Sequence, residues 1–190
     1  KIFPNTESKI NLVIDLPDYA ERATKSGVKE VGLVRLESLI SGKGKHPVWY
    51  IKNNKLGDYI SLIYESLRKI SRHFNQVKIR LTNFRSDEYS NLEGFPERKE
   101  INPLLGDYGI RFGLKNQDLM EAELCAIKEL ADEYDDKKFG VMLPKVISVN
   151  EIKEAKKIID KIKFPNNVKI GVMIETPAAV QIIDTLCDEG

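Results

Sequence analysis

The sequence predicts an α/β fold built on a parallel β-sheet. Short runs rich in apolar and β-branched residues alternate with amphipathic helical runs, giving five strand-then-helix units. Repeated units of this kind imply parallel strands joined by right-handed crossovers. Residues 170–174 are apolar on both faces, which is typical of a parallel sheet covered by helices. Two folds fit this pattern, an open doubly wound sheet and an eight-stranded barrel.

The first unit and the second strand are defined by proline and glycine. Residues 11–15 are expected to form the first strand. Pro17 opens a helix with acidic residues in its first turn, and Gly27 is a natural stop. Residues 28–36 form the second strand, followed by a Gly/Lys loop over residues 41–47.

The middle of the chain contains two clear helices and one long irregular stretch. Residues 58–74 carry a single apolar stripe, and residues 77–81 form the third strand. Residues 83–117 show no periodicity, and a segment of that length without structure of its own is more often functional than idle. Residues 118–134 form the next helix.

The last two units have the sharpest boundaries. Residues 139–144 form the fourth strand, and Ser148 with Glu151 predicts a capping box at the following helix. Residues 168–175 form the fifth strand. Pro177 then opens the last helix, because proline suits the first helical position.

Composition excludes several classes of protein. The 190 residues are 42% hydrophobic and 31% charged, typical of a globular domain, and the net charge of +1 gives no bulk attraction to nucleic acid. No apolar run reaches the ~20 residues of a membrane helix. Cys125 and Cys187 sit in apolar helical patterns, which indicates reduced, buried thiols in a cytoplasmic protein.

Three ionisable residues lie at or near the carboxyl ends of expected strands. They are Arg35, Arg80 and Glu175. Active sites of parallel α/β folds lie at this edge. Arginine forks match phosphate or carboxylate oxygens in pairs, and a carboxylate is a hard ligand for Mg²⁺. The pattern suits an anionic substrate held beside a divalent cation.

A structural interpretation of the same charges stands beside this one. Arg35 could pair with Glu37, and Arg80 with Asp87 or Glu88, as ordinary surface ion pairs. Glu175 is harder to explain in that way, because its strand is otherwise wholly apolar.

Six motifs in order resemble the barrel domain of the phosphoenolpyruvate (PEP)-utilising enzymes. They are VGLVRLE (31–37), HP (46–47), RLTNFRSDEY (80–89), NPLLG (102–106), MLP (142–144) and GVMIETPAA (171–179). Each motif is weak by itself, but six in sequence are specific. The stretch 84–94 is most similar to the phosphoenolpyruvate synthase branch (pyruvate, water dikinase).

The resemblance implies a (β/α)8 barrel that binds PEP or pyruvate with Mg²⁺. Arg35 and Arg80 match the arginines that hold the phosphoryl group, and Glu175 matches the glutamate ligand of Mg²⁺. In the synthase branch, ATP phosphorylates a histidine on a separate domain, and that phosphohistidine domain donates the phosphoryl group to pyruvate in the barrel.

The sequence departs from the family pattern at two positions. Tyr108 stands where an arginine facing the active site is expected, and Asn83 stands where an aspartate is common. Arg111 is the nearby arginine that would take over substrate binding. An arginine-to-tyrosine change removes a charge-assisted hydrogen bond worth roughly 1.5–3 kcal/mol.

The resemblance also implies a barrel truncated after about five βα units, with residues 1–190 as its incomplete PEP/pyruvate-binding domain. The family's Asn-Asp pair, its catalytic cysteine and its ATP-binding and phosphohistidine domains are expected elsewhere in a parent protein. Cys187 is not that cysteine, because it lies in the helix after Glu175.

We therefore expect this piece to have no turnover of its own and to form a homodimer through open strand edges. Two alternatives remain open at this point. One is a non-catalytic barrel module that binds a phospho-ligand or a partner protein. The other is the barrel of an enzyme I-type phosphotransferase.

Overall fold

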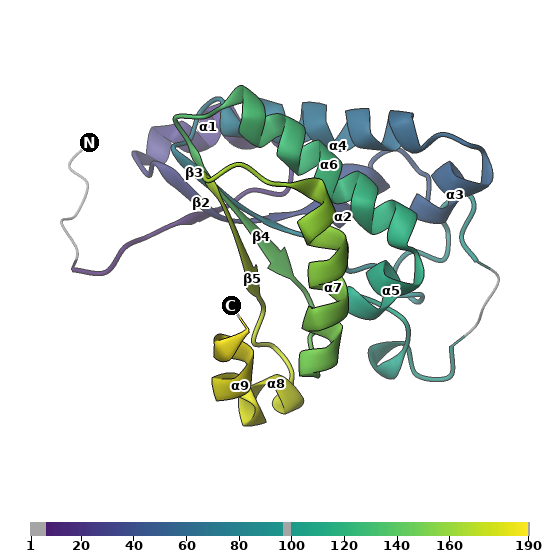
Figure 1. The fold of residues 1–190 in the computed structure, drawn as a ribbon. Coiled ribbons are helices and arrows are strands. Elements are labelled where there is room, and N and C mark those ends of the chain that lie inside the picture. The colour runs from purple at the N-terminus through teal and green to yellow at the C-terminus, as the bar shows by residue number, and fades with distance from the viewer. Residues whose placement is uncertain (1–6, 97–99, 190) are drawn as a thin grey trace.

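The computed structural model describes residues 7–96 and 100–189 as a parallel sheet with helices packed on one side (Figure 1). All four strand pairings are parallel. The strands are β1 (Leu12–Val13), β2 (Glu30–Arg35), β3 (Gln76–Arg80), β4 (Lys138–Leu143) and β5 (Val168–Val172). The predicted α/β fold of five parallel strands alternating with helices is confirmed.

The strands follow one another across the sheet in the order of the chain, β1-β2-β3-β4-β5. A doubly wound sheet reverses direction at a switch point, whereas a barrel adds each strand beside the last. The order therefore fits the barrel pattern. Among the strands described, β1 and β5 each have a neighbour on one side only. β1 is two residues long, shorter than predicted, and β5 ends at Val172 rather than at Glu175.

The helices agree with the sequence where apolar stripes are long. The predicted helices 58–74 and 118–134 and the helix capped by Ser148 correspond to the three longest helices. The helices are α1 (Ala20–Ala23), α2 (Leu36–Ser41), α3 (Pro47–Lys52), α4 (Leu56–Ser71), α5 (Ile110–Lys115), α6 (Gln117–Glu133), α7 (Val149–Ile162), α8 (Pro177–Gln181) and α9 (Ile183–Asp188). The capping box at α7 is present, with the Ser148 side chain accepting from the Glu151 N–H.

Two segments differ from the prediction. The single helix expected after Pro17 is a chain of short turns, although it ends as predicted at Gly27 with a φ of 81°. The stretch 83–117 contains the 3₁₀ turn Pro103–Leu105 and α5, so the expectation that it lacks structure was wrong for that part. Residues 97–99 of this stretch lie outside the described residues.

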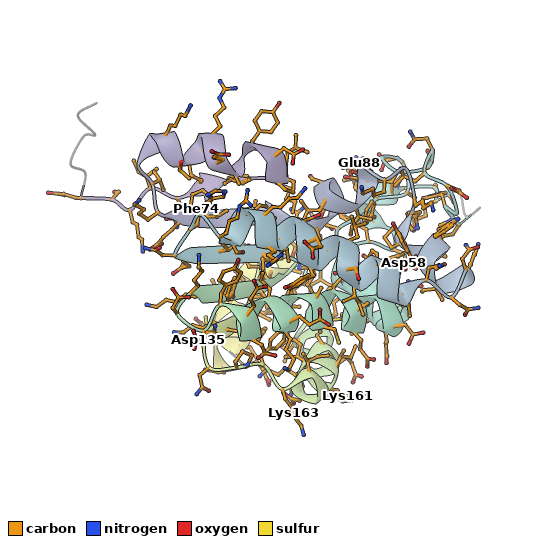
Figure 2. All side chains as sticks on the ribbon, turned by 90° about the horizontal axis from the view of Figure 1, so that it is seen from above. Asp58, Phe74, Glu88, Asp135, Lys161 and Lys163 are labelled. Carbon is orange, nitrogen blue, oxygen red and sulfur yellow. The ribbon has the colours of Figure 1, made fainter. Side chains whose placement is uncertain are left out.

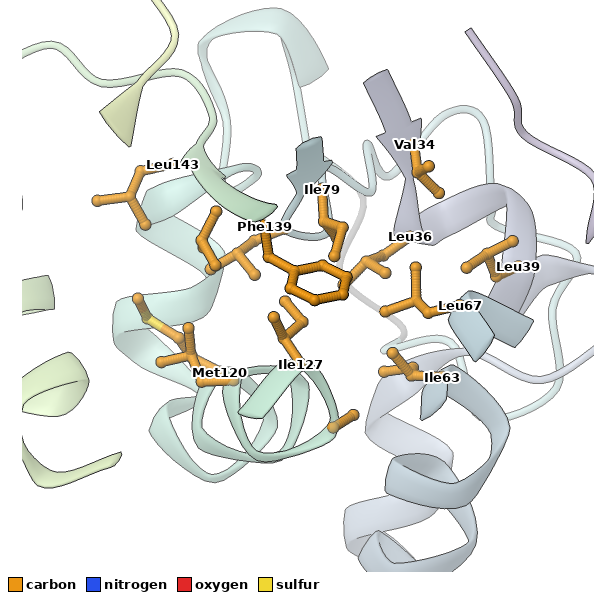
Figure 3. Close-up of a cluster of buried hydrophobic side chains, with 14 of the residues drawn as sticks. Val34, Leu36, Leu39, Ile63, Leu67, Ile79, Met120, Ile127, Phe139 and Leu143 are labelled. Carbon is orange, nitrogen blue, oxygen red and sulfur yellow. The ribbon is translucent and has the colours of Figure 1, made fainter. Parts of the chain in front are cut away.

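The core lies between the sheet and the helices α4 and α6. Phe139 of β4 sits at its centre, 2% exposed, with Ile79 of β3 beside it (Figure 3). Ile63 of α4 and Ile127 of α6 close the other side (Figure 3). Burying a side chain of this size contributes roughly 1.5–3 kcal/mol. This packing holds β3 and β4 firmly, and so fixes the ends of both strands.

The outer strand and the last helix are less covered than the sequence suggested. Ile170 of β5 is 37% exposed, because β5 is an edge strand of the described sheet. The expectation that this strand is buried on both faces was therefore wrong. Cys187 of α9 is exposed and Cys125 is partly buried, which corrects the predicted burial of both thiols; both are free.

Because all strands are parallel, their carboxyl ends lie at one edge of the sheet. Phe74 and Asp135, which precede β3 and β4, lie at one end of the molecule, and Glu88 lies at the other (Figure 2). Over residues 7–96 and 100–189, none of the helices combines the length and apolar character needed to cross a membrane.

Candidate functional site

A cavity of about 370 Å³ lies at the carboxyl ends of the strands. Arg35 from β2, Arg80 from β3 and Glu175 from the segment after β5 all line it. Its walls are formed by Arg35, Glu37, Ser38, Arg80, Asn83, Arg85, Glu88, Tyr89, Leu104, Tyr108, Lys145 and Glu175. The structure thus brings together the three charges that the strand-end rule selected.

Arg80 is held by Glu37. The Arg80 guanidinium donates to the Glu37 carboxylate, and the two side chains are 11% and 5% exposed. Burial raises the pKa of the Glu37 carboxyl, and the charge of Arg80 opposes that rise. One oxygen of Glu37 and the Nε of Arg80 have no hydrogen-bond partner among the described residues. The pair fixes the guanidinium while leaving part of its hydrogen-bonding capacity unused.

Arg35 is held by Asp15, which follows β1. The Nη1 of Arg35 lies 2.5 Å from Oδ2 of Asp15, and both side chains are partly exposed. The sequence offered Glu37 as a partner for Arg35, and Asp87 or Glu88 as partners for Arg80. Those pairs were wrong, because Glu37 bonds Arg80 and the other two carboxylates bond Arg85.

Glu175 is fixed by the backbone of the neighbouring strand. Its Oε1 accepts from the Lys145 N–H at 2.8 Å, and its Oε2 lies 3.7 Å from the Lys145 Nζ. Thr176 follows Glu175, caps α8 by accepting from the Ala179 N–H, and donates to the Val146 carbonyl. These contacts tie the segment after β5 to the end of β4. The carboxylate is therefore held at the cavity wall.

Two oxygen-bearing side chains of the cavity wall, those of Glu175 and Asn83, can hold a divalent cation. The Asn83 Oδ1 is buried and has no hydrogen-bond partner among the described residues. It lies beside Gly109 and Lys145, because a Cβ built on Gly109 would be 3.0 Å from this oxygen and 2.8 Å from the Lys145 Cβ. Lys145 in turn donates its N–H to the Glu175 carboxylate, so Asn83 and Glu175 line the same part of the cavity. Mg²⁺ binds one or two protein oxygens and keeps waters and substrate oxygens. Glu175 and Asn83 fit that requirement.

A complete protein cage for a metal is not present in the part of the chain that the structure describes. No group of three or more histidine, cysteine, aspartate or glutamate side chains could hold an ion there.

Tyr108 and Arg111 are neighbours, with the Arg111 guanidinium carbon 5.7 Å from the centre of the Tyr108 ring, but they differ in their relation to the cavity. Tyr108 lines the cavity and is 3% exposed. Arg111 is not among the described residues that line the cavity. Its guanidinium donates to the carbonyls of Gly106 and Lys145 and lies 3.7 Å from Glu151. The role of Arg111 in substrate binding stays a prediction, because its guanidinium makes these contacts beside Tyr108 and is not part of the described cavity lining.

Among the charged residues that the sequence reasoning missed at this edge, two come shortly after strands. Asp15 follows β1 and holds Arg35, and Lys145 follows β4 and lines the cavity. Both were within reach of the rule that selected Arg35, Arg80 and Glu175. Each strand is followed or ended by one charged residue of the site.

A buried carboxyl supports the turn behind Arg80. Glu123 of α6 is 2% exposed and accepts from the Thr82 N–H at 3.1 Å, from the Thr82 hydroxyl at 2.6 Å and from the Tyr59 hydroxyl at 2.9 Å. Burial raises its pKa to about 7, and the hydrogen bonds from Thr82 and Tyr59 oppose that rise. Because Thr82 stands between Arg80 and Asn83, this network fixes the turn that presents both residues.

His46 belongs to a separate aromatic cluster. It is 2% exposed, and its ring meets those of Phe84, Phe95 and Phe112 edge-on. Its Nδ1 accepts from the Val48 N–H at the start of α3. Burial lowers the pKa of His46 to about 4, with a smaller contribution from the charge of Lys52. These contacts give His46 a structural role as a neutral ring.

Comparison with protein families gives a match over almost the whole chain. Residues 2–189 match the family described as "PEP-utilising enzyme, PEP-binding domain". The chain belongs to this family. As a member of the PEP-utilising enzymes, it carries the strand-end charges described above in the domain that binds PEP in that family.

Several curated relatives of this PEP-utilising domain come from archaea. A probable phosphoenolpyruvate synthase of Archaeoglobus fulgidus is 39% identical over 100% of this chain and 25% of its own length. The phosphoenolpyruvate synthase of Pyrococcus furiosus is 36% identical over 97% of this chain and 23% of its own length. A probable phosphoenolpyruvate synthase of Methanocaldococcus jannaschii is 36% identical over 100% of this chain and 16% of its own length. The chain spans about a quarter or less of these relatives.

Proposed function

We propose that the chain is the PEP- and pyruvate-binding part of a phosphoenolpyruvate synthase. One observation carries the proposal: Arg35 at the end of β2, Arg80 at the end of β3 and Glu175 shortly after β5 line a single cavity. The three relatives described above, all named as phosphoenolpyruvate synthases or probable synthases, support the same assignment.

The arginines are proposed to bind the phosphoryl group. A guanidinium presents paired donors that match phosphoryl oxygens, and Asp15 and Glu37 hold the two forks in place. Phosphoryl transfer depends mainly on positioning and on neutralising charge, so fixed cations supply much of what the reaction needs. Mg²⁺ bound at Glu175 and Asn83 would neutralise charge on the oxygens of the ligand.

The remaining steps belong to the whole synthase. In this proposal a phosphohistidine domain of the parent protein delivers the phosphoryl group to pyruvate, after ATP has phosphorylated that histidine. The overall reaction converts ATP, pyruvate and water into AMP, PEP and phosphate. The chain by itself is proposed to bind ligand without turnover.

We also propose that the sheet is part of a (β/α)8 barrel. The sequential strand order supports it, and so do the single-sided pairings of β1 and β5. Those edges offer unpaired backbone groups, and a homodimer of the 190-residue chain formed through them is part of the proposal. Analytical ultracentrifugation of the chain tests the homodimer, and a monomer at all concentrations would reject it.

A non-catalytic binding module is the second candidate. Tyr108 favours it, because a buried phenol rather than a cation forms part of the cavity wall. If a longer protein that contains this chain binds PEP with Mg²⁺ but forms no PEP from ATP and pyruvate, this candidate is correct. Formation of PEP by that protein would reject it.

Calorimetric titration with PEP, with and without Mg²⁺, tests the binding role. Arg35→Met removes a charge whose side chain is 40% exposed, so the fold should persist, and PEP affinity should fall about tenfold to hundredfold. Glu175→Gln should remove the enhancement by Mg²⁺ and should not weaken Mg²⁺-free binding, because it removes a negative charge from the wall. Arg72→Met, at the opposite end of the strands, is the control for net charge. Equal affinity of Arg35→Met and Arg72→Met would reject the proposed site.

A further inference from the structure

Lys145 lines the cavity and comes from the end of the strand between those of Arg80 and Glu175. Its side chain is 25% exposed, so the ammonium is partly shielded but within reach of a small ligand. The Nζ lies 3.7 Å from the Glu175 Oε2, which is longer than a good charge-assisted hydrogen bond. The ammonium is therefore placed at the cavity without being committed to this carboxylate.

The backbone of Lys145 adopts a conformation that lysine rarely takes. Its φ is +58°, in the left-handed region, and a non-glycine residue there carries a cost that its surroundings must offset. The Lys145 N–H donates to Glu175, and the Lys145 carbonyl accepts from Arg111. Gly109 packs against its Cβ so closely that a methyl group on Gly109 would not fit. Three separate contacts thus hold this residue in an unfavourable conformation.

The contacts of Arg111 and Gly109 both connect α5 to the turn that follows β4. Together with the bond from the Ile110 N–H to the Pro144 carbonyl, they fasten the start of α5 to the turn that carries Lys145. Backbone strain that is held in this way is concentrated at functional sites. Arg111 thus contacts the turn that carries Lys145 and is not itself among the described residues that line the cavity.

The charge of the cavity wall depends on Lys145. Among the described residues that line it, four are cations, Arg35, Arg80, Arg85 and Lys145, and three are carboxylates, Glu37, Glu88 and Glu175. The balance of four against three leaves one positive charge. Without Lys145 the wall would be neutral, and a neutral wall has little attraction for a multiply charged anion.

We propose that Lys145 is a ligand-binding residue of this cavity, whose ammonium contacts an anionic oxygen of the phosphorylated acid beside Glu175. The inference rests on the proposed function, since it assigns a further contact for the same ligand. It also gives a reason for the left-handed turn after β4: this turn points a long cationic side chain at the carboxyl edge of the sheet.

The test uses the 190-residue chain and three probes, PEP, pyruvate and inorganic phosphate, each with Mg²⁺. Lys145→Met should weaken PEP binding in calorimetric titration about tenfold to hundredfold, and Lys145→Arg should restore most of it. Lys163→Met is the matched control, because Lys163 also has a left-handed φ, of 54°, and lies at the margin of the molecule away from Glu88 (Figure 2). It should bind PEP like the wild type.

A direct readout separates contact from a structural role. The ammonium signal of Lys145 in the NMR spectrum, assigned by its loss in Lys145→Met, should shift when PEP is added. A shift with phosphate places the contact at the phosphoryl group, and a shift with pyruvate places it at the carboxylate. If PEP binds and none of the probes shifts this signal, the inference is wrong.

A failure of the proposed function can be distinguished from a failure of the role assigned to Lys145. If Arg35→Met weakens PEP binding and Lys145→Met does not, the proposed function stands and the role of Lys145 is rejected. If the wild-type chain does not bind PEP, both are rejected. Circular dichroism of each variant identifies any loss of affinity that comes from unfolding. If Lys145→Met unfolds, the lysine signal of the wild type, assigned instead by its loss in Lys145→Arg, decides.

Discussion

The Arg80 guanidinium at the end of β3 donates to the Glu37 carboxylate in α2, and both side chains are nearly buried. The pair holds a cation at the cavity wall, but removing one partner leaves the other buried and uncompensated. The position of the Arg80 guanidinium and the stability of the fold are therefore linked.

This link predicts strong non-additivity. Arg80→Met should lower the free energy of unfolding by about 3–5 kcal/mol, and Glu37→Met by a similar amount, because each leaves an isolated buried charge. The double variant should be much less destabilised than the sum, since no charge is left unpaired. Urea unfolding of the four proteins measures this coupling. Additive losses would show that the two side chains do not interact.

Glu123 should make stability fall as pH rises. Its pKa is raised from 4.5 to about 7, so between these values the unfolded state releases a proton that the folded state keeps. Unfolding is then favoured by increasing pH, by about 1.4 kcal/mol per pH unit from this group. Glu123→Gln cannot ionise. The stability of the wild type relative to this variant should decrease from pH 4.5 to pH 7, as measured by urea unfolding at each pH.

His46 should have the opposite effect. Its pKa is lowered from 6.5 to about 4, so below pH 6.5 the unfolded state binds a proton that the folded state does not. Stability from this group is complete above pH 6.5 and is lost as pH falls toward 4. His46→Asn keeps an acceptor for the Val48 N–H but removes the titration. Its stability should therefore be less sensitive to acid than that of the wild type.

The two buried groups oppose each other between pH 4.5 and pH 6.5. Their contributions should cancel in the wild type and appear only when one is removed. A wild-type profile that follows either single variant would contradict this account.

Gly109 should be intolerant of a side chain because of its neighbours and its backbone together. Its φ is +63°, and an added Cβ would lie 2.8 Å from the Lys145 Cβ. Gly44 has a φ of +70° with nothing within 4 Å of such a Cβ. Gly44→Ala should therefore cost only the backbone strain, about 1 kcal/mol, and Gly109→Ala clearly more. Equal losses in thermal unfolding would show that the contact with Lys145 has no consequence.

The sequence predicted the parts of the fold that rest on long, regular patterns. The apolar stripes of α4 and α6 and the capping box at Ser148 gave helices close to those observed. The short turns after Pro17 and the helix α5 carry no such pattern, because each is fixed by contacts with distant segments rather than by its own periodicity. The order of the strands in the sheet also depends on tertiary packing, so no local sequence pattern predicts it.

The candidate site was predictable where one rule applied. Arg35, Arg80 and Glu175 were found because strand ends of a parallel sheet share an edge, and the same rule reaches Lys145 and Asp15. The partners of the two arginines were not predictable from the sequence. Asp15 reaches Arg35 because β1 pairs with β2, and Glu37 reaches Arg80 because α2 lies near the end of β3. The placement of Arg111 beside Tyr108 rather than in the cavity lining was not predictable for a similar reason, since the orientation of α5 is set by its docking on the end of β4.

Each of the five strands contributes one charged position to the carboxyl edge of the sheet, and these positions lie apart from the apolar core. Asp15, Arg35, Arg80, Lys145 and Glu175 are each attached to a different strand of the sheet. Arg80 has to be kept, because its buried pair with Glu37 supports the fold. A combinatorial library over the other four codons would vary ligand preference while leaving the apolar layer around Phe139 unchanged. Apart from Arg80, the scaffold and the chemistry at its rim can therefore be varied separately.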